Sequence, residues 1–260
     1  MPTKISAQNV TKTFPSLNGP VTALDDFSLE VEDGEFVCVV GPSGCGKSTF
    51  LRILAGLEPL SSGSVHIVPG ADPGKPLNNL VFQEYAIFPW KTVIDNVAFG
   101  LQMRGVSKKE RYEVADTWLA RVGLRRFASY YPAQLSGGMK QRVSIARALA
   151  NDPEVLLMDE PLGALDAQTR IVLQEELLRI WEAHRKTVVY ITHSIDEAIL
   201  LGDRVVIMTA HPGTLKTIFD VPLPRPRTIQ TTATPEFAEL SGAIWEALQD
   251  EVRRAMEAQM

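Results

Sequence analysis

A run of glycines around one lysine is the feature of this sequence best suited to chemistry. Residues 41–48 are Gly-Pro-Ser-Gly-Cys-Gly-Lys-Ser, the spacing of a phosphate-binding loop. Glycines let backbone N–H groups point at phosphate oxygens, and the positive end of a following helix adds attraction. Lys47 would reach the β- and γ-phosphates of a nucleotide, and the Ser48 hydroxyl would hold Mg²⁺. We assign phosphate binding to Gly41, Pro42, Ser43, Gly44, Cys45, Gly46, Lys47, Ser48 and Thr49.

Two adjacent carboxylates follow an apolar run later in the chain. Residues 155–158 are all apolar, and Asp159 and Glu160 come directly after them. A buried strand here would carry both acids to its carboxyl end, beside the phosphate loop. Asp159 would then hold Mg²⁺ through water, and Glu160 would act as general base on the attacking water. Two acids after a strand usually mark a solvated turn, but the upstream phosphate loop favours the catalytic interpretation.

A second glycine loop, at residues 135–139, precedes a predicted helix over residues 140–150. Ser136, Gly137 and Gly138 occupy the positions of an N-cap and an anion site. One subunit needs a single phosphate cradle, so a second one needs an explanation. Taken alone, the loop is equally compatible with an ordinary capped helix start.

The elements that must position these residues have an α/β pattern. A buried strand over residues 35–40 ends at the phosphate loop, and a helix over residues 48–57 follows it. Two half-buried antiparallel strands come earlier, at residues 3–10 and 27–31. Strand, loop and helix in this order begin a parallel α/β core. Further strands are predicted at residues 63–68 and 80–82, and core-type strands at residues 155–158, 187–192 and 204–209.

Between residues 92 and 135 the strand signal disappears. Helices are predicted at residues 93–103, 108–122 and 125–129, which suggests a helical subdomain inserted at about residues 88–150. The expected fold is therefore a P-loop NTPase core with a mainly parallel sheet, an N-terminal antiparallel β portion and this subdomain. We expect the main domain over residues 1–220, and a proline-rich segment with an amphipathic helix over residues 221–260.

The motifs in this order resemble the ABC ATPase family, whose signature is a Leu-Ser-Gly-Gly stretch followed by Gln-Arg, here Gln141-Arg142. The resemblance covers about residues 9–212. It includes lesser motifs, and some of their residues also have ordinary structural explanations. Phe14 could simply be packed, His193 could be a core or capping histidine, and Asp166 could be a helix cap. The matches are Phe14 for the adenine-stacking aromatic, Gln83 for the Q-loop, Ala164-Leu165-Asp166 for the D-loop and His193 for the switch histidine.

The resemblance implies an ATP hydrolase coupled to transmembrane transport, with ATP and Mg²⁺ as ligands. It also implies a dimer in which the Ser136 loop of one subunit closes over ATP held by the P-loop of the other. Hydrolysis would stay slow until closure expels water. The implied roles are catalysis for Glu160, His193 and Gln83, metal binding for Ser48, Gln83 and Asp159, and nucleotide contact for Phe14, Ser136, Gly137, Gly138 and Asp166.

The composition limits the partners. The net charge of −5 provides no basic footprint for nucleic acid, so no nucleic-acid partner is expected. The start of the chain has no apolar signal core, and no stretch approaches the roughly 18 uncharged apolar residues of a membrane span. Any membrane role must come through a partner. The two cysteines, Cys38 and Cys45, are expected to be reduced thiols.

One segment points to a branch of the family. Residues 83–90, Gln-Glu-Tyr-Ala-Ile-Phe-Pro-Trp, are apolar and aromatic where exposure is expected, and exposed apolar patches mark contacts. Together with residues 192–198 and 223–227 they resemble the nitrate, sulfonate and taurine importer group. That resemblance implies uptake of a small anion such as nitrate, sulfonate, taurine or bicarbonate. It also implies permease subunits docking near Tyr85 to Trp90, an extracytoplasmic solute-binding protein, and a peripheral location on the cytoplasmic face of a bacterial-type inner membrane.

Other classes fit less well. An importer ATPase for another small organic solute remains open, because no residue here touches the solute. Soluble ABC ATPases of DNA repair or translation have long coiled-coil insertions or two ATPase domains, and this chain has neither. A GTP-binding switch would carry a guanine-reading Asn-Lys-x-Asp motif, which is absent.

Overall fold

A six-stranded sheet forms the centre of the computed structural model, which describes residues 2–17, 19–163 and 165–257. Its strand order is β5-β6-β7-β3-β8-β9, parallel except for β9, which runs antiparallel to β8. All five residues of β3 are buried and apolar, as expected for a parallel strand covered on both faces. The strands are β3 (Phe36–Val40), β5 (Asn78–Val81), β6 (Val155–Asp159), β7 (Thr187–Ile191), β8 (Arg204–Met208) and β9 (Leu215–Asp220).

A three-stranded antiparallel sheet shares a hydrophobic cluster with this central sheet. It consists of β1 (Thr3–Phe14), β2 (Val21–Glu32) and β4 (Ser62–Ile67), in the order β2-β1-β4. The predicted strands are confirmed, but β1 and β2 extend further and pair out to Phe14 and Val21. The inner face of this sheet packs on the helix that follows the P-loop, α1 (Lys47–Leu54), where the rings of Phe27 and Phe50 lie 4.6 Å apart.

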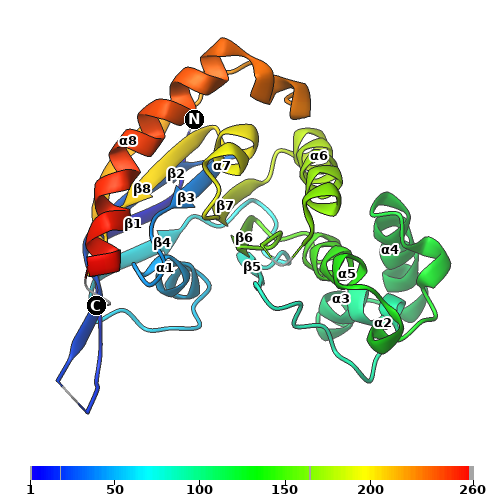
Figure 1. Cartoon of the computed structure of the whole chain (residues 1–260). Coiled ribbons are helices and arrows are strands. Elements are labelled where there is room, and N and C mark those ends of the chain that lie inside the picture. The colour runs from blue at the N-terminus through cyan, green and yellow to red at the C-terminus, as the bar shows by residue number, and fades with distance from the viewer. Residues whose placement is uncertain (1, 18, 164, 258–260) are drawn as a thin grey trace.

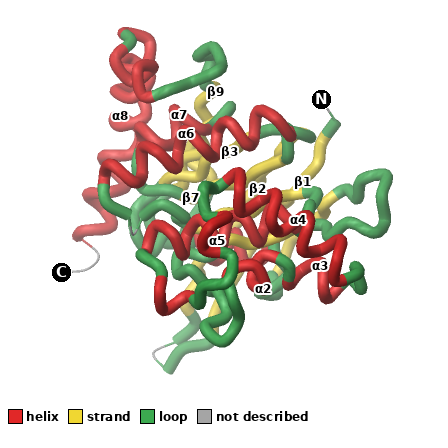
Figure 2. Tube along the Cα trace, turned by 90° about the vertical axis from the view of Figure 1, so that its right-hand side faces the viewer, coloured by secondary structure: helices red, strands yellow, loops and turns green. Residues whose placement is uncertain are grey.

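A helical lobe lies on the right of Figure 1 and gathers α2 to α5 together in Figure 2. The predicted helix over residues 93–103 is instead two short helices that meet at Ala98, where ψ is −8° and not the helical value of about −42°. The helix expected over residues 125–129 is only a 3₁₀ turn, Arg125–Phe127. The lobe consists of α2 (Val93–Val97), α3 (Phe99–Met103), α4 (Lys108–Arg121) and α5 (Gly137–Ala150).

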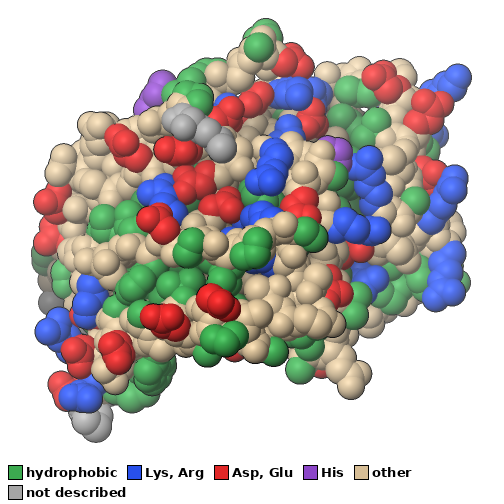
Figure 3. All heavy atoms as spheres, turned by 90° about the horizontal axis from the view of Figure 1, so that it is seen from above, with side chains coloured by type: hydrophobic (Ala, Val, Ile, Leu, Met, Phe, Trp, Pro, Cys, Tyr) green, Lys and Arg blue, Asp and Glu red, His purple; other side chains and the backbone are tan. Residues whose placement is uncertain are grey.

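Charge is unevenly spread over the surface. The face in Figure 3 mixes acidic and basic side chains, with basic ones more frequent toward the side of the helical lobe. The exposed basic residues of α4 and its flanks belong to this side: Lys108, Lys109, Arg121, Arg125 and Arg126.

The tail is folded onto the body. The remaining helices are α6 (Ala167–His184), α7 (Ile195–Leu201) and α8 (Pro235–Glu257). Helix α8 confirms the predicted amphipathic helix, and its apolar stripe of Phe237, Ile244 and Leu248 is buried against the chain's own core. The division of the chain at residue 220 stays a prediction. Within the described ranges no helix is long and apolar enough to cross a membrane.

Packing of α8 leads to a stability prediction. Ile244 is 0% exposed, whereas its neighbour Trp245 is 52% exposed. Ile244→Ala should lower the free energy of unfolding by about 2–5 kcal/mol, because it leaves a cavity in the core. Trp245→Ala is the control and should change it by about 0.5 kcal/mol or less. Urea unfolding checks both, and equal effects would show that α8 is not packed as the structure has it.

Candidate functional site

The candidate site lies where parallel strands end. In an open α/β sheet the carboxyl ends of the strands form the binding edge. The P-loop follows β3, Gln83 follows β5, Asp159 ends β6 with Glu160 directly after it, and His193 follows β7. Residues that are far apart in the sequence therefore meet at one edge of the sheet.

The P-loop has the shape and charge for phosphate. Gly44 and Gly46 have φ values of +78° and +101°, and a Cβ at Gly46 would lie 2.6 Å from the carbonyl oxygen of Ala23. The buried ammonium of Lys47 donates to the carbonyl oxygens of Gly41 and Pro42, at 2.8 and 2.9 Å. No carboxylate in the described part of the chain forms an ion pair with it. A buried cation is costly unless it is closely paired, and a phosphate would supply a close negative charge.

Ser48 and Asp159 form a pair of oxygen ligands. The Ser48 hydroxyl donates to Asp159 Oδ1 at 2.9 Å, although the two residues are far apart in the chain. Burial raises the pKa of Asp159; the hydrogen bond from Ser48 opposes this rise, and the charge of Glu160 adds to it. A hydroxyl and a poorly hydrated carboxylate side by side suit a hard cation such as Mg²⁺, whose charge would favour the ionised acid.

Glu160 is the point where two other strand ends meet. His193 Nδ1 lies 3.3 Å from Glu160 Oε2, and Gln83 Nε2 donates to the same oxygen at 3.5 Å. Glu160 has a φ of +42°, a left-handed conformation that non-glycine residues rarely adopt outside constrained sites. The structure thus brings together the three residues predicted for catalysis. The predicted metal role of Gln83 stays a prediction.

Phe14 lies at the end of β1 and pairs with Val21 of β2. The Lys12 ammonium lies 4.7 Å from the centre of its ring. It is partly exposed and so is available to a planar ligand. Its adenine-stacking role stays a prediction.

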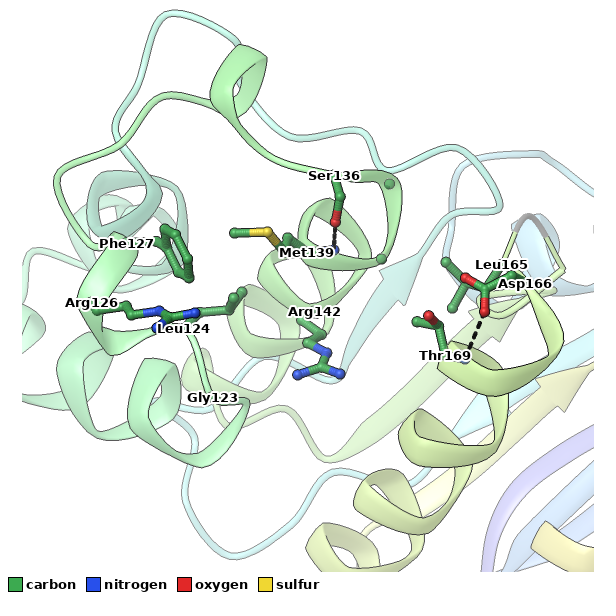
Figure 4. A pocket seen from close by; sticks show the side chains of 12 residues that line it. Gly123, Leu124, Arg126, Phe127, Ser136, Met139, Arg142, Leu165, Asp166 and Thr169 are labelled. Carbon is green, nitrogen blue, oxygen red and sulfur yellow. Dashed lines mark hydrogen bonds between the residues drawn. The ribbon is translucent and has the colours of Figure 1, made fainter.

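The second glycine loop caps α5. Ser136 accepts a hydrogen bond from Met139 N–H at 3.3 Å, and the helix begins at Gly137, three residues earlier than predicted. Figure 4 shows that this loop borders a cavity whose other wall comes from the start of α6. On that wall Asp166 accepts from the N–H of Thr169 at 2.9 Å, so it does cap a helix. Ala164 of the same predicted motif lies outside the described residues.

Part of this cavity could not be predicted from the motifs. Arg126 and Phe127 line it from the 3₁₀ turn before the glycine loop, and Thr169 lines it from α6. None of them has a fixed spacing from a glycine motif. The Arg-Arg pair at positions 125–126 is the only local signal, and in the sequence it is equally typical of a solvated surface.

Among the described residues, the cavity at the second glycine loop is separate from the P-loop. The cavity at Ser136 is lined by the helical lobe and α6, and none of its lining residues belongs to the P-loop. In Figure 1, α1 and α5 lie on different sides of the molecule. A phosphate held by the P-loop therefore does not lie in the Ser136 cavity of the same chain.

This fold and site define a P-loop ATPase core with an inserted helical lobe that presents a second anion-binding loop. A family model described as ABC transporter matches residues 24–163, more than half of the chain. Among solved structures, a dimeric post-hydrolysis state of the ATP-binding cassette MJ0796 bound to ADP and Pi superposes with a TM-score of 0.75. It is 34% identical and covers 85% of this chain and 100% of that one.

Proteins of similar sequence are also named as ATP-binding proteins of transporters. The uncharacterized ABC transporter ATP-binding protein MJ0412 of Methanocaldococcus jannaschii is 50% identical, over 98% of this chain and 95% of its own length. The nitrate import ATP-binding protein NrtD of Synechococcus elongatus is 48% identical, over 89% and 86%. The bicarbonate transport ATP-binding protein CmpD of Synechocystis is 48% identical, over 86% and 80%. The chain belongs to the ABC transporter family, as an ATP-binding subunit that hydrolyses ATP to drive transport.

The grouping around Glu160 leads to a catalytic prediction. Glu160→Gln should keep ATP binding but lower turnover about 10²- to 10⁴-fold, because a positioned base is lost while the P-loop is unchanged. Phosphate release and equilibrium ATP binding measure the two effects. Glu175→Gln, an exposed change on α6, is the control and should be neutral. Turnover within a few-fold of the wild type in Glu160→Gln would remove Glu160 from the role of base.

Proposed function

We propose that this chain drives uptake of a small anion as one half of an ATPase dimer, bound at the cytoplasmic face of a membrane to permease subunits. The observation that carries the proposal is the site itself. Glu160 contacts Gln83 and His193, and the nearby Lys47 has no ion-pair partner among the described carboxylates.

The residues divide the work on ATP. Phe14 stacks on the adenine, the P-loop amides and Lys47 hold the phosphates, and Ser48, Asp159 and Gln83 hold Mg²⁺. The metal, when bound, supplies positive charge at the β- and γ-phosphate oxygens. Glu160 accepts a proton from the attacking water, and His193 orients Glu160 and the γ-phosphate. The contacts of Glu160 Oε2 with Gln83 and His193 support these roles.

The second glycine loop is the reason to propose a dimer. Ser136, Gly137 and Gly138 lie at the start of a 14-residue helix, a position that favours an anion. The P-loop of the same chain does not reach them. Head-to-tail packing of two copies would place this loop, with Asp166 beside it, over ATP held by the partner. Closure would also exclude water, so hydrolysis depends on assembly.

A mixed dimer tests the shared site. One subunit carries Lys47→Ala and the other Gly138→Asp, so both lesions fall on one composite site and the other site stays intact. Hydrolysis should exceed that of dimers with both lesions in every subunit, where both sites are damaged. ATPase rates of purified mixed and double-mutant dimers measure this. Equally low rates in folded dimers would count against shared sites.

The proposed permease dock is a groove that begins at the catalytic site. Its volume is about 770 Å³, and the residues that line it include Gln83, Tyr85, Ile87, Pro89 and, from α5, Lys140. Trp90 follows the lining residue Pro89 in the chain and is 72% exposed, with its ring 5.7 Å from that of Phe88. An exposed tryptophan beside an apolar groove is a typical anchor for a partner. Because Gln83 contacts Glu160, a helix seated here would sense the state of the site.

The solute class follows from the relatives. NrtD and CmpD are described by nitrate import and bicarbonate transport, and both substrates are small anions. We extend this class to the present system, with sulfonates and taurine as further candidates and an extracytoplasmic solute-binding protein as the upstream partner. Uptake of labelled nitrate, bicarbonate and taurine by cells with and without this gene would identify the solute, and unchanged uptake of all small anions would overturn the class.

Two exposed tryptophans provide a matched test of the dock. Trp90→Ala should weaken permease binding by about 2 kcal/mol or more, because a central anchor is lost. It should leave unfolding and ATP binding by the isolated subunit unchanged. Trp245→Ala on α8 removes the same ring from another surface and should not affect assembly. Co-purification with the permease and solute uptake are the measurements, and normal assembly of Trp90→Ala would place the dock elsewhere.

A further inference from the structure

The C-terminal helix ends against the turn that joins β8 and β9. Glu251, three residues after the buried Leu248, is 1% exposed. Its Oε2 accepts a hydrogen bond from the N–H of Ala210 at 2.9 Å, and its Oε1 accepts one from Lys216 Nζ at 2.7 Å. Arg254 lies 3.3 Å from Oε1. A buried carboxylate is costly unless it is paired, so these contacts hold both ends of the β8–β9 connection in place.

This turn, residues 209–214, supports the P-loop. A Cβ at Gly213 would lie 2.0 Å from the carbonyl oxygen of Cys45, so the two backbones are in direct contact and only glycine fits. The N–H of Gly213 donates to Ala23 at 3.0 Å, and its carbonyl accepts from Asp25 at 3.1 Å. The turn is thus fixed between the P-loop and β2.

Helix α8 also faces the P-loop across a cavity of about 550 Å³. Ser43 and Gly44 form one wall, and Ala210, Glu251 and Arg254 form the other. In Figure 1 the end of α8 lies at the same end of the core as α1. Glu251 therefore connects the last helix of the chain to the loop that receives the phosphates.

We propose that Glu251 is a positioning residue for ATP. By holding the amide of Ala210 it holds the turn, and through Gly213 the turn keeps the P-loop in its phosphate-binding shape. A hydrogen bond from N–H to a carboxylate is roughly twice as strong as a neutral one, which suits it to this task. A loop that binds through backbone amides loses affinity when it must be ordered first. The inference rests on the proposed role of the P-loop in binding ATP.

Three variants of the full chain test this role. Glu251→Ala should raise the Kd and the KM for ATP about tenfold and change kcat little, because Glu160 and its partners are untouched. Glu251→Gln should restore part of the affinity, because the amide oxygen can still accept from Ala210 but forms a weaker, uncharged hydrogen bond. Asp250→Ala removes an exposed carboxylate from the same helix and should bind ATP like the wild type.

The outcomes separate positioning from mere stabilisation. A folded Glu251→Ala protein that melts at a lower temperature but binds ATP as tightly as the wild type would overturn the proposal. If that variant does not fold, hydrogen exchange on the wild type decides. ATP should slow exchange in residues 209–214 as well as in the P-loop, and no change in the turn would overturn the proposal. A wild-type chain that fails to bind ATP would instead refute the proposed function.

Discussion

The phosphate loop must be rigid and yet leave open the space that phosphates occupy, and the rest of the structure serves this constraint. Its glycines remove side chains from that space, so stiffness has to come from outside the loop. It comes from β3 before it, α1 after it, Ala23 against Gly46, and the 209–214 turn against Cys45. Lys47 completes the loop by bonding to its carbonyl oxygens, which leaves a buried positive charge facing the site.

The second constraint is that the proposed hydrolysis and its proposed coupling to the permease both depend on the contact between Glu160 and Gln83. Glu160 contacts His193 and Gln83 through a single carboxylate oxygen, and Gln83 also begins the groove where we propose the permease docks. A change at the dock can therefore be transmitted to Glu160, the proposed base, through the side chain of Gln83. The left-handed backbone at Glu160 is energetically unfavourable for a non-glycine residue, and such strain is typical of positions where a side chain must be placed accurately for function.

The separation of the two glycine loops is what the proposed dimer accounts for. The Ser136 loop lies at the start of α5, as an anion site would, but the described residues that line its cavity include none of the P-loop. Assembly, closure and hydrolysis are thus linked in the proposed dimer. Helix α8 faces the P-loop of its own chain across a cavity and contacts the 209–214 turn through Glu251.

The sequence alone determined the P-loop, the acids of β6, the signature loop, the family and the α/β class. Each depends on spacing within a short segment, which local backbone rules control. It also predicted most core strands and α8, but missed β9, and treated residues 93–103 as one helix because a bend at Ala98 leaves the apolar pattern intact. Only the tertiary structure decided that Gln83 and His193 meet on Glu160, that Arg126 lines the Ser136 cavity, and that Glu251 holds Ala210. These contacts join residues from separate elements, and no local pattern records which elements pack together.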